Sequence, residues 1–153
     1  MIAPFKKKQD RHVISRASKF YLFDVGVAGS ITKRRIEEER GELFGNAFEH
    51  FILMELCAYN SYKELDFEIN FWRTKSGLEV DFILAGGEVA IEVKGASHVD
   101  KRDLRPLKTF VNLYSPRKSL VVCNEKEKRI HEKIQIMPWR KFLNDLWDGE
   151  IIK

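Results

Sequence analysis

Hydrophobic residues recur along the chain with two different spacings. Between residues 42 and 59 they cover most of a helical wheel, which is typical of a helix buried on several sides. Between residues 66 and 72 apolar and polar side chains alternate, as they do in a half-buried strand. The two spacings predict helices at about 42–59, 103–114 and 138–148 and strands at 66–72, 78–84, 88–94, 119–123 and 134–136. The expected order is α-β-β-β-α-β followed by a strand and a helix, an α/β protein of the α+β type with a mixed sheet.

The first 40 residues give a weaker pattern. One short apolar element at 19–23 is followed by glycines and then by a charged run at 33–40. We therefore expect a basic N-terminal lead-in at 1–40, consistent with the remnant of an upstream region, and one folded domain at 41–153.

The predicted strands 78–84 and 88–94 form an antiparallel hairpin. Gly86 and Gly87 lie between them, and such a pair can adopt the positive φ angles of a tight turn. A two-residue turn fixes the register, because each residue then has one opposite partner. The apolar pairs Leu84/Val89, Phe82/Ile91 and Val80/Val93 would share one face, and Asp81/Glu92 and Glu79/Lys94 would share the other.

This register brings two carboxylates, Asp81 and Glu92, side by side. Unit charges about 5 Å apart repel by about 3 kcal/mol at an effective dielectric constant of about 20, so the pair needs a proton, a basic neighbour or a metal cation. Oxygen ligands suit Mg²⁺ or Mn²⁺, and Lys94 on the same face could orient or help deprotonate an attacking water. The alternative is a salt bridge between Glu79 and Lys94 beside an acid pair on a solvated sheet face.

Asp81, ten intervening residues and Glu92-Val93-Lys94 resemble the D-x(n)-E-x-K signature of the PD-(D/E)xK nuclease superfamily. The resemblance implies a restriction-endonuclease-like αβββαβ core, here with an added C-terminal strand and helix. It also implies a metal held by Asp81, Glu92 and an acid on the first helix. Gly45-x-x-x-Glu49 is similar to the helix of resolvase-like members, which makes Glu49 the third ligand. Glu55, inside the apolar arc of the same helix, remains the alternative.

A more specific resemblance covers roughly residues 19–124. The segments that carry it run from Lys19 to Gly26, from Phe48 to Leu56 and from Phe71 to Phe82. They are similar to a domain of unknown function that usually follows an AAA-type ATPase in prokaryotic proteins. This resemblance implies an ATPase partner or a missing upstream ATPase domain.

Charge is distributed unevenly along the chain. The 27 Lys and Arg residues exceed the 23 Asp and Glu residues, for a net charge of +4, yet residues 41–100 are acidic and both flanks are basic. The acidic centre contains every proposed metal ligand, and the basic flanks suit a polyanion. The expected nucleic-acid-binding residues are Arg73, Lys75, Lys101, Arg102, Arg105 and Lys108. Trp72 is expected to pack in the sheet rather than to stack on a base.

Several other functions are excluded or disfavoured by the sequence. No Gly precedes a Lys, so a Walker A loop is impossible, and the four His and two Cys residues lack zinc-site spacing. No segment resembles a membrane span or a secretion signal, which favours a cytoplasmic setting. We therefore expect a Mg²⁺- or Mn²⁺-dependent endonuclease domain that hydrolyses phosphodiester bonds of DNA. The alternative is an inactive nuclease-like module that binds nucleic acid or a partner ATPase.

Overall fold

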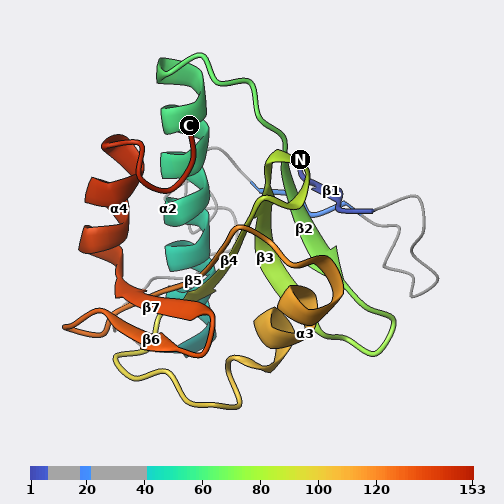
Figure 1. Cartoon of the computed structure of the whole chain (residues 1–153), viewed down its shortest axis with the longest axis vertical. Helices are drawn as coiled ribbons and strands as arrows, with labels where there is room; N and C mark the ends of the chain where they lie inside the picture. Colours follow the sequence, from blue (N-terminus) through green and yellow to red (C-terminus); the bar gives the residue numbers. More distant parts are fainter. Residues whose placement is uncertain (7–17, 22–40) are drawn as a thin grey trace.

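A seven-stranded mixed sheet separates one layer of helices from another (Figure 1). The structure is a computed structural model, which describes residues 1–6, 18–21 and 41–153. The strand order is β1-β2-β3-β4-β5-β7-β6, with β2, β3 and β4 antiparallel and β4, β5 and β7 parallel. The elements are β1 (Ala3–Pro4), α2 (Gly41–Tyr62), β2 (Ile69–Arg73), β3 (Glu79–Leu84), β4 (Val89–Lys94), α3 (Arg105–Tyr114), β5 (Lys118–Cys123), β6 (Arg129–His131), β7 (Ile134–Pro138) and α4 (Trp139–Trp147).

The mixed α/β fold and the order α-β-β-β-α-β are confirmed. The main differences lie at element ends and in short strands. The first predicted strand begins later, at Ile69, because Asp66 has a φ of 53°, which an extended strand cannot accommodate. Strands β1 and β6 were not predicted, since two and three residues are too few to show a period. Within the described residues, no helix combines the length and apolarity needed to cross a membrane.

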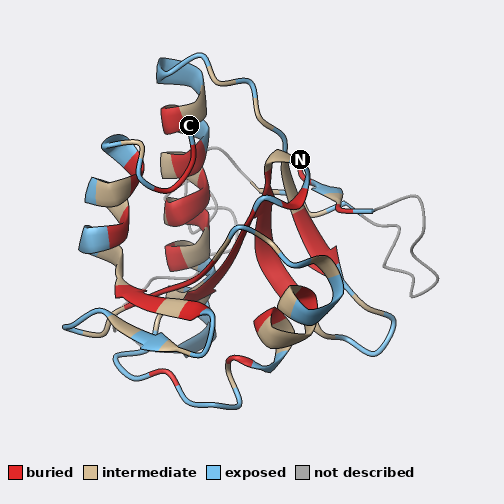
Figure 2. Ribbon diagram, in the orientation of Figure 1, coloured by how far each residue is buried: buried red, intermediate tan, exposed pale blue. Residues whose placement is uncertain are grey.

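Each face of the sheet has its own hydrophobic core (Figure 2). Helices α2 and α4 pack on one face, where Ile52, Leu56 and Phe142 are fully buried. Helix α3 covers the other face through Leu107 and Phe110. Because both faces are covered, the central strands are buried along almost their whole length, as their apolar sequences require.

The hairpin has the predicted register but a longer turn. Phe82 pairs with Ile91 and Leu84 pairs with Val89, as expected. The turn, however, includes Ala85, whose φ of 48° precedes the positive φ angles of the two glycines. The prediction of a two-residue turn was therefore wrong. The predicted register is nevertheless correct, because the turn gains one residue from each strand and the opposite pairs stay the same.

Beyond Phe82, the side chains of the hairpin do not lie on the faces of the sheet that the sequence predicted. Strand β3 contains one extra residue relative to β2, since Ile83 pairs with Asn70 but Val80 pairs with Trp72. This bulge moves Val80 into the α3-side core, whereas Phe82 and Val93 belong to the α2-side core. The expected common face of Val80 and Val93 is wrong, because a bulge interrupts the alternation of side chains.

Described parts of the N-terminal lead-in belong to the same sheet and core. β1 pairs with β2 in parallel, and the backbone of Ile2 exchanges two hydrogen bonds with that of Lys19. Ile2 and Phe5 are buried. The apolar residues 22 and 23, Gly26 and the charged run at 33–40 lie outside the described residues, and the boundary at residue 40 stays a prediction.

We expect Gly87→Ala to destabilise the domain more than Gly86→Ala. Both glycines have positive φ, but a Cβ at Gly87 would lie 2.9 Å from the buried Phe5 ring, whereas Gly86 faces open space. The backbone strain costs about 1–2 kcal/mol at either position, and the clash adds about 1 kcal/mol or more at Gly87. Urea denaturation measures both losses, and equal losses would show that Phe5 does not pack on the turn.

Candidate functional site

The candidate site lies where β3 and β4 stop pairing. The backbone pairing of the two strands ends at Phe82 and Ile91. The next contact between them is made by a side chain: Asp81 Oδ2 accepts a hydrogen bond of 2.8 Å from the backbone N–H of Val93. Only 8% of Asp81 is exposed. The bulge in β3 and this hydrogen bond hold the Asp81 carboxylate against the backbone of β4, next to Glu92.

Glu92 and Lys94 form the second half of the site. Glu92 is only 3% exposed, and its Oε1 lies 2.7 Å from the Lys94 Nζ. The other oxygen, Oε2, is buried without a hydrogen-bond partner among the described residues. A buried carboxylate oxygen without a donor is costly, so this atom can still accept a proton or contact a cation.

A lysine from the N-terminal segment occupies the α2 side of the site. Lys19 Nζ lies 3.1 Å from Glu49 Oε1 and 3.6 Å from Asp81 Oδ1, and it also forms an ion pair with Glu79. The Tyr21 hydroxyl donates a hydrogen bond to the same Glu49 oxygen. One ammonium thus bridges three carboxylates that come from α2 and β3.

The neighbouring lysines compensate the burial of the two carboxylates only in part, and the pKa values of both acids are raised. Burial raises the pKa of Asp81 to about 7, with Glu49 adding to the rise and Lys19 opposing it. Burial and the charge of Asp81 raise the pKa of Glu92 to about 8. Burial by itself would lower the pKa of Lys94, but the attraction of the nearby Glu92 carboxylate is larger than this effect. The pKa of Lys94 is therefore raised, and its amine stays protonated.

The structure separates the two candidate acids of α2. Glu49 shares Lys19 with Asp81, and its charge raises the pKa of Asp81. Glu55 instead accepts a hydrogen bond of 3.1 Å from the indole N–H of Trp147 on α4. Of the two, Glu49 is therefore the one near the proposed metal ligands.

Other parts of the predicted arrangement differ. Glu79 and Lys94 do not pair, because Glu79 contacts Lys19 and Arg73 while Lys94 contacts Glu92. Asp81 and Glu92 do not lie on a solvated face, since both are buried. Asp81 and Glu92 are not a backbone pair, because the pairing of β3 with β4 ends at Phe82 and Ile91. On its other side Glu92 pairs with Val121 of β5, which belongs to the α3-side core.

The predicted nucleic-acid-binding residues fall into two groups. Arg73 reaches the site through its ion pair with Glu79, and Lys75 is exposed in the turn before β3. The others lie around the start of α3, where Lys101, Arg102 and Arg105 are exposed and Lys108 pairs with Glu132 at 2.7 Å. Trp72 is buried against Phe110, so packing, not base stacking, is confirmed.

The donor set of the site suits a hard divalent cation only in part. Asp81 and Glu92 offer carboxylate oxygens, and the unpartnered Glu92 Oε2 is an open ligand position. Among the described residues, however, no three His, Cys, Asp or Glu side chains converge on one point. The carboxylate of Glu49 is held by Lys19 and Tyr21.

Sequence reasoning assigned no role to Lys19 and Tyr21. Both belong to the Lys19-Phe20-Tyr21 run, in which alternate residues face the same side. The one signal in the sequence was the surplus of acids in residues 41–100, because any of these acids that are buried need cations from elsewhere in the chain. That signal indicates a counter-ion without indicating which lysine supplies it.

Fold and site together define a mixed α/β domain with a buried acidic site at the point where β3 and β4 stop pairing. The chain belongs to a family described as Domain of unknown function (DUF4143), whose model matches residues 44–142, more than half of the chain. The match includes Glu49, Asp81, Glu92 and Lys94 but begins after Lys19. No curated protein and no solved structure matches the chain significantly.

We expect the metal-free protein to lose stability as the pH rises from 5 to 8. With pKa values raised to about 7 and 8 in Asp81 and Glu92, the folded state retains protons that the unfolded chain has already released, so the free energy of unfolding falls with pH. Glu92→Gln cannot ionise and should reduce this loss by at least about 1 kcal/mol. Urea denaturation in EDTA at both pH values measures the effect.

The matched control for this measurement is Glu127→Gln. Glu127 is exposed and distant in sequence from the site, so its replacement should leave the pH dependence unchanged. The interpretation fails if Glu92→Gln and wild type lose the same stability between pH 5 and pH 8.

Proposed function

We propose that this chain is a metal-dependent nuclease domain of the PD-(D/E)xK type that hydrolyses phosphodiester bonds of DNA. The observation that carries the proposal is the pair of buried carboxylates, Asp81 and Glu92, with raised pKa values beside a protonated Lys94. These three residues form the D-x(n)-E-x-K pattern, and perturbed acids beside a lysine are typical of catalytic sites.

Asp81 and Glu92 would hold a Mg²⁺ or Mn²⁺ ion, with Glu49 as a further ligand once its carboxylate is released from Lys19. A bound divalent ion would supply Lewis-acid stabilisation of the phosphate and a nucleophilic hydroxide at neutral pH. The ion would also satisfy the Glu92 Oε2 atom, which has no partner among the described residues. Displacing the protons of Asp81 and Glu92 costs little near pH 7, because their pKa values are close to it.

Lys94 acts as a cation in this proposal. Its raised pKa makes it a poor base at neutral pH, but its ammonium can orient a water molecule and stabilise the negative charge that develops on the phosphoryl oxygens. The ion pair with Glu92 limits the positions that the ammonium can take. Orientation of water is therefore the better supported of the two roles considered for Lys94.

Arg73, Lys75 and the basic residues at the start of α3 would contact the DNA backbone on either side of the acids. Exposed Lys and Arg side chains bind phosphates without reading the sequence. An ATPase of the AAA type, as a partner or an upstream domain, belongs to the same proposal and rests on the resemblance of residues 19–124 alone.

One observation favours a second candidate, a nuclease-like module that binds nucleic acid or a partner ATPase without cutting. Lys19 already neutralises part of the acidic cluster. If the ammonium stays there when DNA is bound, the carboxylates have a structural partner and need no metal ion. The two candidates are therefore separated by cleavage and by metal binding.

We expect wild-type protein to nick plasmid or cut single-stranded DNA in Mg²⁺ or Mn²⁺, and Asp81→Asn and Lys94→Ala to reduce the rate by at least about 100-fold. Gel analysis of cleavage over time provides the measurement. Lys126→Ala, an exposed residue of the β5–β6 loop, is the matched control and should cleave normally. Absence of cleavage by wild type, or cleavage by both site variants at the wild-type rate, would favour the non-cutting module.

We expect Lys19→Met to bind Mn²⁺ about tenfold more tightly than wild type, because a positive charge 3.6 Å from Asp81 opposes a second cation. Electron paramagnetic resonance of free Mn²⁺ measures the affinity without requiring activity. Lys63→Met, at an exposed position directly after α2, should leave the affinity unchanged. Unchanged or weaker binding by Lys19→Met would show that the ammonium does not compete with the ion.

A further inference from the structure

The acidic site is contacted by an N-terminal arm, defined here as residues 18–21. Lys19 and Tyr21 of this arm face the acids, whereas Phe20 between them is 75% exposed, in keeping with the alternation of side chains in an extended segment. The arm presents one ammonium and one hydroxyl to the site, and both groups bind carboxylates there. Its polar side-chain contacts are therefore concentrated on the acids.

The arm uses oxygen atoms that a metal ion would need. Asp81 Oδ2 already accepts a hydrogen bond from the backbone of β4, so Oδ1 is the oxygen left for a cation. Lys19 Nζ lies 3.6 Å from this Oδ1 and 3.1 Å from Glu49 Oε1. The Tyr21 hydroxyl donates a hydrogen bond to the same Glu49 oxygen. While the arm is docked, it occupies candidate ligand atoms in two of the proposed metal ligands.

Apart from the acids, the arm is held in the described structure by a short backbone bridge and by contacts of its two inner side chains. Two backbone hydrogen bonds, of 2.9 and 3.0 Å, join Lys19 to Ile2, next to the two-residue strand β1 at the edge of the sheet. Lys19 Nζ lies 5.6 Å from the centre of the Phe71 ring, and the Tyr21 ring lies 5.9 Å from that of His50. Short contacts at a sheet edge open at low free-energy cost, so the ion pairs with the acids are a main part of the attachment.

The docked arm and a divalent ion compete for the same negative charges. Glu49, Glu79 and Asp81 surround the single ammonium of Lys19. A divalent ion bound to Asp81 Oδ1 would lie close to this ammonium, and like charges repel strongly in partly buried surroundings. The ion and the docked arm therefore oppose each other, and by linkage each weakens the binding of the other.

We propose that the N-terminal arm is an autoinhibitory element: while it is docked the acids cannot complete the metal site, and a divalent ion binds as the arm withdraws. The proposal rests on the metal site of the proposed function and adds its regulation. The apparent affinity for the ion is lower than that of the open site, in proportion to the fraction of chains whose arm is withdrawn. The site consequently stays without an ion until the free metal concentration exceeds this raised threshold.

Hydrogen exchange measured by NMR on the full chain, in EDTA and in saturating Mg²⁺, tests the proposal. The backbone N–H of Lys19 donates to the carbonyl oxygen of Ile2 at 3.0 Å, so its exchange rate reports whether the arm is docked. We expect Mg²⁺ to accelerate this exchange at least about tenfold, because the ion destabilises the docked arm. The backbone N–H of Val93, which donates to Asp81, reports ion binding independently through its chemical shift. The N–H of Ala90, inside the sheet, should exchange at the same rate in both conditions.

Tyr21→Phe weakens the attachment of the arm without removing a charge. The variant loses the hydroxyl that binds Glu49, so in EDTA its Lys19 N–H should exchange faster than in wild type. Its affinity for Mg²⁺ should rise about fivefold, because less attachment has to be lost when the ion binds. Tyr62→Phe is the matched control: Tyr62 is exposed at the other end of α2, and its replacement should change neither quantity.

Regulation by the arm and cleavage of DNA fail in different ways. The arm proposal is overturned, and the metal site stands, if Mg²⁺ shifts the Val93 signal but leaves the exchange of Lys19 unchanged or slower, or if Tyr21→Phe binds Mg²⁺ as wild type does. A Val93 signal that does not respond to Mg²⁺ overturns both proposals. Faster exchange of Lys19 in Mg²⁺ without any cleavage of DNA supports the arm and contradicts only the nuclease.

Discussion

Two carboxylates buried next to each other, where β3 and β4 part, are the constraint on which this structure depends. Burial of a carboxylate is costly unless hydrogen bonds or opposite charges compensate it. Asp81 obtains a backbone N–H from β4 and the ammonium of Lys19, and Glu92 obtains Lys94. The compensation is incomplete, since both acids retain raised pKa values and one Glu92 oxygen has no partner in the described chain.

The covered sheet explains why the acids are buried at all. Helices on both faces exclude water from the central strands, so a polar side chain at the hairpin break enters a weakly polarisable environment. The bulge in β3 directs Asp81 towards α2, while Glu92 alternates with the α3-side core. Asp81 and Glu92 therefore approach the end of the β3–β4 pairing from different faces of the sheet.

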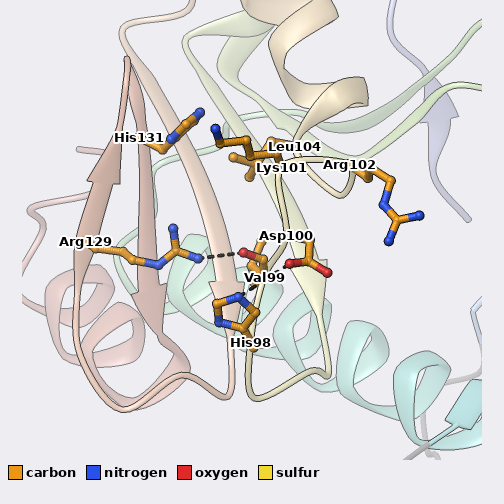
Figure 3. Close-up of a pocket in the computed structure, with 8 residues that line it drawn as sticks. All are labelled: His98, Val99, Asp100, Lys101, Arg102, Leu104, Arg129 and His131. Atoms are coloured by element: carbon orange, nitrogen blue, oxygen red, sulfur yellow. Dashed lines mark hydrogen bonds and ion pairs between the residues drawn. The ribbon is translucent and has the colours of Figure 1, made fainter.

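The acidic central segment and the basic N-terminal part of the chain meet at the site. The acids of residues 41–100 include Glu49, Glu79 and Asp81, which gather around the Lys19 ammonium from the basic N-terminal part, whereas Glu92 pairs with Lys94. The counter-ion is thus supplied from outside the segment that the family model matches. On the C-terminal side, Lys101, Arg102 and Arg129 line a pocket that contains none of the acids of this site (Figure 3).

The sequence by itself determined the long helices, the central strands and the hairpin register, because these follow from local periodicity and from a turn that gains residues in pairs. It also singled out Asp81, Glu92 and Lys94 by their spacing. Only the tertiary structure decided that Val80 changes faces, that Lys19 and Tyr21 contact Glu49, and that Glu55 pairs with Trp147. Bulges and ion pairs between distant segments depend on packing across the whole sheet, and no local pattern of residues encodes them.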